Sequence, residues 1–297
     1  MEHDLEEALD NIIQLAKQNP EFNRELRKRL QIDPSASSSS ISDHKIDSIY
    51  EYCIQEIIKQ HATEFYKDFP VKSIVPNLVE DFARMEGFRR KNQFGDFCLA
   101  AYQQIECITN HLCQSRILSE ITDRMWGYPA YVLNEIGKTP TIDKRLDKSE
   151  YSIAKLLMPK EPEKKYTQSL QTQNARDKMR IIVYFLGYGA LMTSGDYNYF
   201  YEFSTSLSDL YQCRNLNHKG NTLTQWEQDI YNKILPLKSF YYFKFIGVLT
   251  QFVECVKNGY NNLDDIHDFA MTLIPKEVKS SGPKIIGKID VSQYKKY

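Results

Sequence analysis

Three side chains around position 215 could act together on a phosphate group. Residues 211–220 read YQCRNLNHKG, so Arg214, Asn215 and His218 fall within five positions. If the local backbone is helical, Arg214 and His218 are i and i+4 and lie on one face. The guanidinium is a permanent cation for a phosphate oxygen, and histidine, with an unperturbed pKa of about 6.5, can transfer protons at neutral pH. Asn215 could orient either group through a hydrogen bond.

The same spacing also has a simpler interpretation. Cationic side chains are favoured at the end of a helix because they lie beside its last carbonyl groups. Arg214 and His218 could therefore finish a helix without doing chemistry. A similar choice applies to Glu106, a carboxylate amid apolar residues of a predicted helix, which either has a role in a site or faces outward. Residue types and spacing leave these alternatives open.

The segment resembles the Arg-Asn…His signature of the HEPN superfamily, the higher eukaryote and prokaryote nucleotide-binding domains. The resemblance implies an all-helical domain over about residues 75–260 and a metal-independent endoribonuclease of bacterial defence or toxin–antitoxin systems. It implies that His218 is a general acid or base when an RNA 2′-hydroxyl attacks its own phosphate. Arg214 would stabilise the transition-state charge, and Asn215 would position the imidazole or the phosphate. Three residues separate Arg214 from His218, fewer than is usual in the family.

The resemblance also implies partners. The substrate would be RNA, and a homodimer would place two motifs face to face, so that one histidine acts as acid and the other as base. A protein partner, an antitoxin or another defence component, fits the same context. No metal or other cofactor is expected, because the residues around 214–218 offer no carboxylate ligand set. The alternative is a non-catalytic helical module that binds a protein partner or nucleic acid, which the short spacing favours.

Composition limits the other functions. A net charge of −1 gives no overall attraction to nucleic acid or to a membrane surface. Residues 275–297 hold six lysines and two acidic residues, so this basic tail either adds RNA affinity or is merely solvated. The six cysteines include no C-x-x-C pair, which is typical of free thiols in a reducing, cytoplasmic location. The longest apolar stretch, residues 181–192, is shorter than the roughly 20 residues that span a bilayer, so no membrane contact is expected.

Helical periodicity dominates the chain, and glycine and proline are scarce at 12 and 11 residues. The sequence therefore predicts an all-α, HEPN-like multi-helix bundle with an N-terminal helical appendage. We expect a helical pair at 1–32, a serine-rich linker at 33–43, the bundle at 44–274 and the basic tail at 275–297. Few apolar contacts should cross such a linker, so residues 1–32 should be dispensable for folding of the remainder.

Individual helices are predicted from apolar spacing and from local start and stop signals. Thr224 and Glu227 form a plausible capping box, Pro236 should end the helix that follows, and Gly259 should stop the helix after that. The cluster Asp264, Asp265, His267 and Asp268 is interpreted as a solvated first turn rather than a metal site. The predicted helices cover residues 43–65, 76–88, 97–118, 153–158, 175–192, 197–211, 225–235, 240–257 and 263–273.

Overall fold

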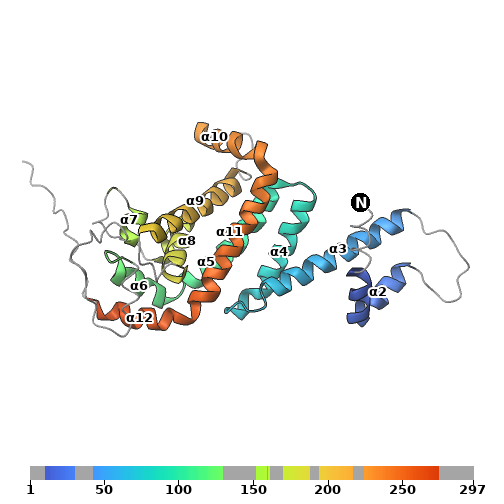
Figure 1. Ribbon diagram of the computed structural model, residues 1–297, viewed down its shortest axis with the longest axis horizontal. Helices are drawn as coiled ribbons and strands as arrows, with labels where there is room; N and C mark the ends of the chain where they lie inside the picture. Colours follow the sequence, from blue (N-terminus) through green and yellow to red (C-terminus); the bar gives the residue numbers. More distant parts are fainter. Residues whose placement is uncertain are drawn as a thin grey trace, which may run out of the picture. The chain divides into compact units, whose positions relative to one another are not determined.

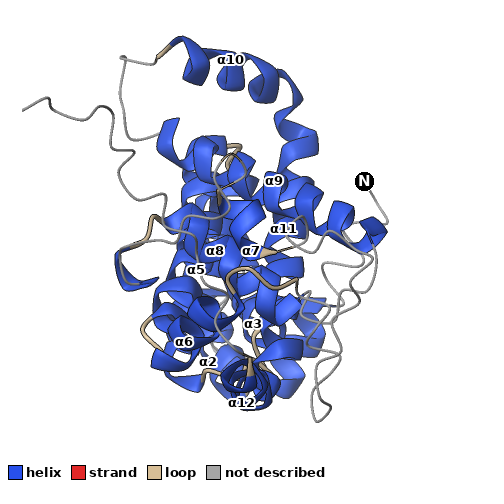
Figure 2. Ribbon diagram, turned by 90° about the vertical axis from the view of Figure 1, so that its left-hand side faces the viewer, coloured by secondary structure: helices blue, strands red, loops and turns tan. Residues whose placement is uncertain are grey.

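The computed structural model describes residues 11–30, 43–129, 152–158, 160, 170–187, 194–216 and 224–273. Within these ranges nearly every residue is helical and no strand occurs, which confirms the all-α prediction (Figure 2). No helix in the same ranges combines the length and apolar character needed to cross a bilayer. Most of the predicted linker, residues 33–42, and the whole basic tail lie outside the described residues.

The chain divides into two compact units, residues 1–100 and residues 101–297, and the boundary falls within helix α5 (Phe94–Cys113). Each unit has its own set of packed helices. The candidate site lies in the second unit, so the first is described only briefly. The predicted domain limits at residues 32, 43 and 274 stay predictions.

In the first unit, the N-terminal helices pack on the first half of α3 (Asp43–Phe65). Residues 11–18 are helical, and α2 covers Pro20–Leu30. Leu15, Phe22 and Cys53 form a buried cluster, and the rings of Phe22 and Tyr52 stack with centroids 5.7 Å apart. The expectation of few apolar contacts between these helices and the following chain was therefore wrong. A short amphipathic helix is marginal in water and needs an apolar surface to cover, and α3 supplies one.

Helix α4 (Val75–Arg90) packs against α3 in the same unit. Pro76 lies in its first turn, as the sequence predicts, where the missing N–H costs nothing. The ring of Phe82 lies 5.0 Å from that of Phe65 between centroids. The helix ends where Asn92 adopts a left-handed conformation (φ 56°), and the Gln93 N–H donates to the Phe88 carbonyl at 2.9 Å.

The second unit begins within α5, and α6 (Arg116–Met125) follows after a short break. The prediction of one continuous helix over 97–118 was wrong. Ser115 takes an extended conformation (ψ 130°) and serves as the N-cap of α6, a position that serine favours. The break was missed because apolar residues continue on both sides of it, so the helical period gives no sign of interruption.

Several short helices precede a π-helix in the second unit. The predicted short helix is confirmed as α7 (Ile153–Leu157), and η3 covers Leu170–Thr172. Helix α8 (Ala175–Ile182) begins where the Asn174 side chain accepts a hydrogen bond from the Asp177 N–H at 3.0 Å. The chain then continues as a π-helix, η4 (Val183–Gly187), in which all residues except the glycine are buried. The predicted helix over 175–192 is thus α-helical over 175–182 and π-helical over 183–187, and residues 188–193 lie outside the described residues.

The π-helix packs closely against α11 (Lys238–Gly259), and two glycines permit this contact. A Cβ on Gly259 would lie 2.3 Å from the Leu186 carbonyl oxygen, and one on Gly187 would lie 2.5 Å from Cys255 Sγ. Helix α11 ends at Gly259, as the sequence predicts, although this glycine stays helical (φ −94°) and the chain continues through η6 (Tyr260–Asn262) into α12 (Leu263–Thr272). Close packing against Leu186 is a second reason for a glycine at this position.

Helices α9 (Ser194–Leu216) and α11 run antiparallel (Figure 1). Two contacts fix their register: Lys244 Nζ lies 3.3 Å from Asp209 Oδ2, and Gln251 Nε2 donates to Tyr199 Oη at 2.7 Å. The end of α9 therefore lies level with the start of α11. Between them in sequence lie α10 (Gln225–Ile234) and η5 (Leu235–Leu237). Pro236 ends α10 as predicted.

The start of α10 also agrees with the prediction from the sequence. The Thr224 and Glu227 side chains each bond the other's backbone N–H, which confirms the capping box. The Thr224 N–H donates to Glu227 Oε2 at 2.9 Å, so Glu227 is buried without being left unsatisfied. This local motif fixes where α10 begins. Residues 217–223 lie outside the described residues.

Candidate functional site

Arg214 lies in the last turn of α9 and contacts two residues of α5. Its guanidinium carbon lies 5.2 Å from the centre of the Tyr102 ring, a cation–π contact. Its Nη2 atom lies 4.0 Å from Glu106 Oε2, an ion pair at the limit of contact. The Arg214 and Glu106 side chains are 28% and 33% exposed, so the pair is reachable from solvent. The arrangement holds a cation at the end of a helix next to a carboxylate and an aromatic ring.

Tyr102 forms the buried floor of this contact. It is 1% exposed, and its ring meets that of Tyr211 in a T-shaped contact with centroids 5.6 Å apart. Burial, and then the negative charge of Glu106, raises the pKa of Tyr102, although Arg214 acts in the opposite direction. The phenol therefore stays protonated at neutral pH. Among the described residues, no hydrogen-bond partner reaches its Oη atom.

The other two motif residues are placed only in part. Asn215 belongs to the last turn of α9. His218 lies outside the described residues, so the predicted pairing of Arg214 with His218 stays a prediction. The structure instead brings Arg214 together with Glu106 and Tyr102. Glu106 was noticed in the sequence as an isolated carboxylate, whereas nothing in the sequence links either residue to Arg214.

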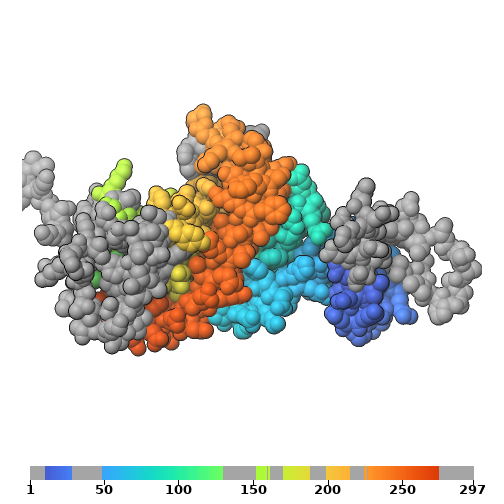
Figure 3. All heavy atoms as spheres, in the orientation of Figure 1, coloured from blue at the N-terminus to red at the C-terminus, as the bar shows by residue number. Residues whose placement is uncertain are grey.

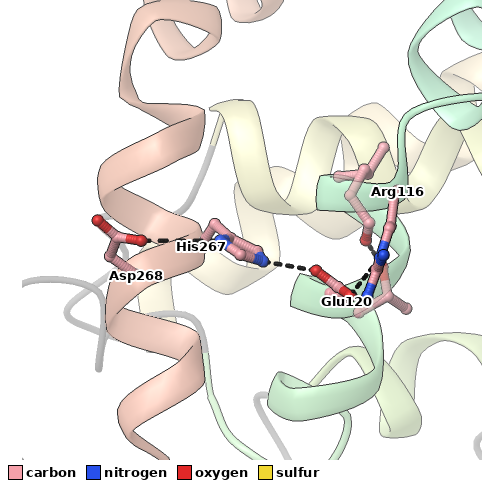
Figure 4. A network of polar contacts seen from close by, with 6 residues as sticks. Arg116, Glu120, His267 and Asp268 are labelled. Carbon is pink, nitrogen blue, oxygen red and sulfur yellow. Dashed lines mark hydrogen bonds and ion pairs between the residues drawn. The ribbon is translucent and has the colours of Figure 1, made fainter.

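A second polar cluster joins α12 to α6 (Figure 4). His267 Nε2 lies 2.7 Å from Glu120 Oε2, and Arg116 Nε donates to Glu120 Oε1 at 2.7 Å. His267 Nδ1 lies 3.8 Å from Asp268 Oδ1. Asp264, Asp265 and Asp268 are exposed, as expected for a solvated first turn. His267 is less exposed and makes its shorter contact across to Glu120 of the neighbouring helix.

The contacts to Glu120 make the α6–α12 pairing sensitive to acid. The hydrogen bond from His267, followed by that from Arg116, lowers the pKa of Glu120 below its usual 4.5. A carboxyl whose pKa is lower in the folded state stabilises that state at pH values above its pKa in the unfolded state. This contribution is lost as the pH falls through its pKa in the folded state. We therefore expect Glu120→Gln to lower Tm at about pH 6 and to lose less Tm than the parent protein on going to about pH 3.

The measurement is thermal unfolding followed by circular dichroism across this pH range. Asp264→Asn is the matched control, since it removes an exposed carboxylate from α12. It should reproduce the pH dependence of the parent protein. An identical acid-induced loss of Tm in Glu120→Gln would contradict the prediction.

Metal-ligating groups and cysteine thiols are the other catalytic groups considered in the described part of the chain. No group of three or more His, Cys, Asp or Glu side chains there could hold a metal ion. All six cysteines are free. Burial raises the pKa of Cys113 to about 12 and that of Cys255 to about 11, so these thiols stay protonated and are poor nucleophiles at neutral pH.

Comparison with known proteins gives no match: no protein-family model, no curated protein and no solved structure matches the chain. The fold itself defines the class of this protein as all-α with multiple helices. The likeness of residues 214–218 to the HEPN signature is a resemblance of that segment alone.

Proposed function

We propose that this protein is a metal-independent endoribonuclease of the HEPN type, with Arg214, Asn215 and His218 as its catalytic residues. The observation that supports the proposal most directly is the setting of Arg214. The side chain is held at the end of α9 by the Tyr102 ring and by Glu106, and it keeps more than a quarter of its surface exposed. A fixed and accessible guanidinium is what a phosphate-binding site requires.

The proposed reaction is transfer of a phosphate ester within the RNA. The 2′-hydroxyl oxygen forms a bond to the adjacent phosphorus while the P–O5′ bond breaks. One histidine takes the 2′-hydroxyl proton, and a second gives a proton to the leaving oxygen. Each chain carries one His218, so a homodimer with two facing motifs would supply both groups. Arg214 stabilises the extra negative charge on the phosphate oxygens.

Glu106 fits this scheme as a residue that places Arg214 before RNA binds. Its 4.0 Å distance from Nη2 exceeds a hydrogen bond, so the contact is electrostatic. A phosphate oxygen would therefore compete with a contact to Glu106 that is longer than a hydrogen bond.

The same contact supports a second candidate, a non-catalytic helical module that binds a protein partner or nucleic acid. An arginine that stacks on a buried tyrosine and pairs with a carboxylate can also serve only to fasten α9 to α5. In that case Arg214 would matter for stability, and His218 would matter little. The two candidates therefore differ in what happens when His218 is removed.

Cleavage of RNA in the presence of EDTA separates the two candidates. We expect the purified protein to cut single-stranded RNA in EDTA, and His218→Ala to slow cleavage by about 10²–10⁴-fold, the usual contribution of acid–base catalysis. His61→Ala, which removes an exposed histidine of α3, is the control and should cut normally. Cleavage that needs added Mg²⁺ or Mn²⁺ would contradict the metal-independent mechanism. The absence of any cleavage would favour the non-catalytic module.

A further inference from the structure

Glu106 is a partly exposed carboxylate that directly faces the proposed phosphate-binding side chain. Its Oε2 atom lies 4.0 Å from Arg214 Nη2, and 33% of the Glu106 side chain is exposed. Both residues belong to the second unit, Glu106 on α5 and Arg214 in the last turn of α9. Part of α9, drawn in gold, lies at the surface of this unit beside α11 (Figure 3). The carboxylate can therefore be reached from solvent at the same place as the guanidinium.

The distance between the two side chains suits a proton acceptor for an RNA 2′-hydroxyl. A phosphate oxygen bound to a guanidinium lies about 2.8 Å from its nitrogen. In a geometry ready for attack, the 2′-oxygen lies about 3–3.5 Å from the phosphorus. These spans are similar in size to the 4.0 Å between Glu106 and the guanidinium. A phosphate held by Arg214 can therefore bring its neighbouring 2′-hydroxyl within hydrogen-bond reach of the carboxylate.

Tyr102, which also contacts Arg214, is a poor acceptor for this proton. It is 1% exposed, and burial, followed by the negative charge of Glu106, raises the pKa of its phenol. The phenol therefore stays protonated at neutral pH. A second His218 could act as the acceptor only if another copy of the chain faced the first. Glu106 is already present in the same chain as Arg214.

We propose that Glu106 is the general base of the RNA cleavage reaction and that His218 of the same chain is its general acid. The inference rests on the proposed ribonuclease function and changes one step of it, because the base comes from α5 rather than from a second histidine.

The step balances without a co-reactant. The Glu106 carboxylate takes the 2′-hydroxyl proton while the 2′-oxygen forms its bond to phosphorus. The P–O5′ bond breaks, and the leaving O5′ takes a proton from the His218 imidazolium. The products are a 2′,3′-cyclic phosphate and a 5′-hydroxyl, and proton exchange with water restores both side chains.

Glu106→Gln is the first test, because the amide keeps the size of the side chain but is not a base. We expect kcat/KM for cleavage of single-stranded RNA in EDTA to fall by about 10²–10⁴-fold, the usual contribution of general acid–base catalysis. The Tm should stay close to the parent value, since a partly exposed ion pair contributes little to stability. Glu254→Gln is the control: its carboxylate on α11 pairs with Lys257 and is 52% exposed, and the variant should cut normally.

An RNA with sulfur in place of the leaving O5′ separates the base from the acid. A thiol, with a pKa of about 8.5, is far more acidic than an alcohol, so the thiolate leaves without taking up a proton. On this substrate His218→Ala should recover most of its lost activity. Glu106→Gln should stay slow, because attack by the 2′-hydroxyl still needs a base.

The pH dependence on the sulfur substrate separates a base from a residue that only positions Arg214. With a carboxylate base, kcat/KM of the parent protein should be level between about pH 6 and 8, above the usual range of carboxylic acids. With a histidine base it should fall about tenfold for each pH unit below about 6.5. If Glu106 only positioned Arg214, this histidine dependence would remain.

The outcomes keep this inference distinct from the ribonuclease function. A histidine-type pH dependence, or normal cleavage by Glu106→Gln, would overturn Glu106 as the base, while cleavage that depends on His218 would leave the ribonuclease standing. Loss of cleavage in Glu106→Gln with no effect of His218→Ala would keep the base and contradict the proposed catalytic set. Failure of the parent protein to cut either RNA would contradict both proposals.

Discussion

Replacing Arg214 with alanine is expected to lower kcat/KM for RNA cleavage by about 10²–10³-fold, the usual cost of removing one group that stabilises transition-state charge. Arg214→Lys should recover only a small part of this activity. Lysine keeps the charge but loses the planar fork that binds two phosphate oxygens at once and that stacks on the Tyr102 ring. The measurement is initial cleavage rate at several RNA concentrations.

The fold should survive the loss of Arg214. A partly exposed ion pair contributes about 0.2–1 kcal/mol, and a cation–π contact about 0.5–2 kcal/mol. Both are small beside a typical stability of about 5–15 kcal/mol. Glu106→Gln is the matched control, because it removes the charge that Arg214 faces but leaves the guanidinium in place. If Arg214→Ala unfolds the protein, or if it cuts RNA normally, the catalytic assignment fails.

Gly259→Ala is expected to reduce the free energy of unfolding by about 3 kcal/mol, at the upper end of the cost of overpacking. The added methyl would lie 2.3 Å from the Leu186 carbonyl oxygen and 2.6 Å from its Cα, and backbone atoms cannot rotate away as a side chain can. The π-helix would have to move off α11. Urea unfolding followed by circular dichroism measures the change.

Gly247→Ala provides the comparison within the same helix. A Cβ at that position meets nothing within 4 Å, so only backbone entropy changes. We expect this variant to be more stable than the parent protein by about 0.5–1 kcal/mol. Equal destabilisation by both substitutions would show that helix propensity, rather than contact with Leu186, determines the effect of Gly259→Ala.

Helices whose signals are local could be predicted from the sequence. Helix α3 follows from the apolar period, α10 from its Thr224–Glu227 capping box, and the end of α10 from Pro236. Features that depend on distant partners could not. The π-helix lies in a segment that is apolar on every side, so no pattern separates it from an α-helix. Gly259 could be predicted as a helix end, but its close contact with Leu186 could not, because Leu186 is distant in the sequence.

The candidate site shows the same division. Arg214, Asn215 and His218 could be singled out because they are neighbours in sequence. The contacts of Arg214 with Tyr102 and Glu106 depend on how α9 packs against α5. This packing cannot be predicted from the local sequence of α5. The break between α5 and α6 was missed for a related reason, since the extended conformation of Ser115 leaves no trace in the apolar spacing.

The pairing of α6 with α12 affects how the protein is made. Glu120 and His267 stand 147 residues apart, and the helices that carry them pack against each other. A ribosome adding about 5–20 residues per second needs roughly 7–30 s to synthesise the intervening chain. During that interval α6 exists without the helix that pairs with it, although its side chains Leu118, Ile121 and Met125 are buried in the complete fold. The α6–α12 pairing can therefore form only late in synthesis, after the intervening chain has been made.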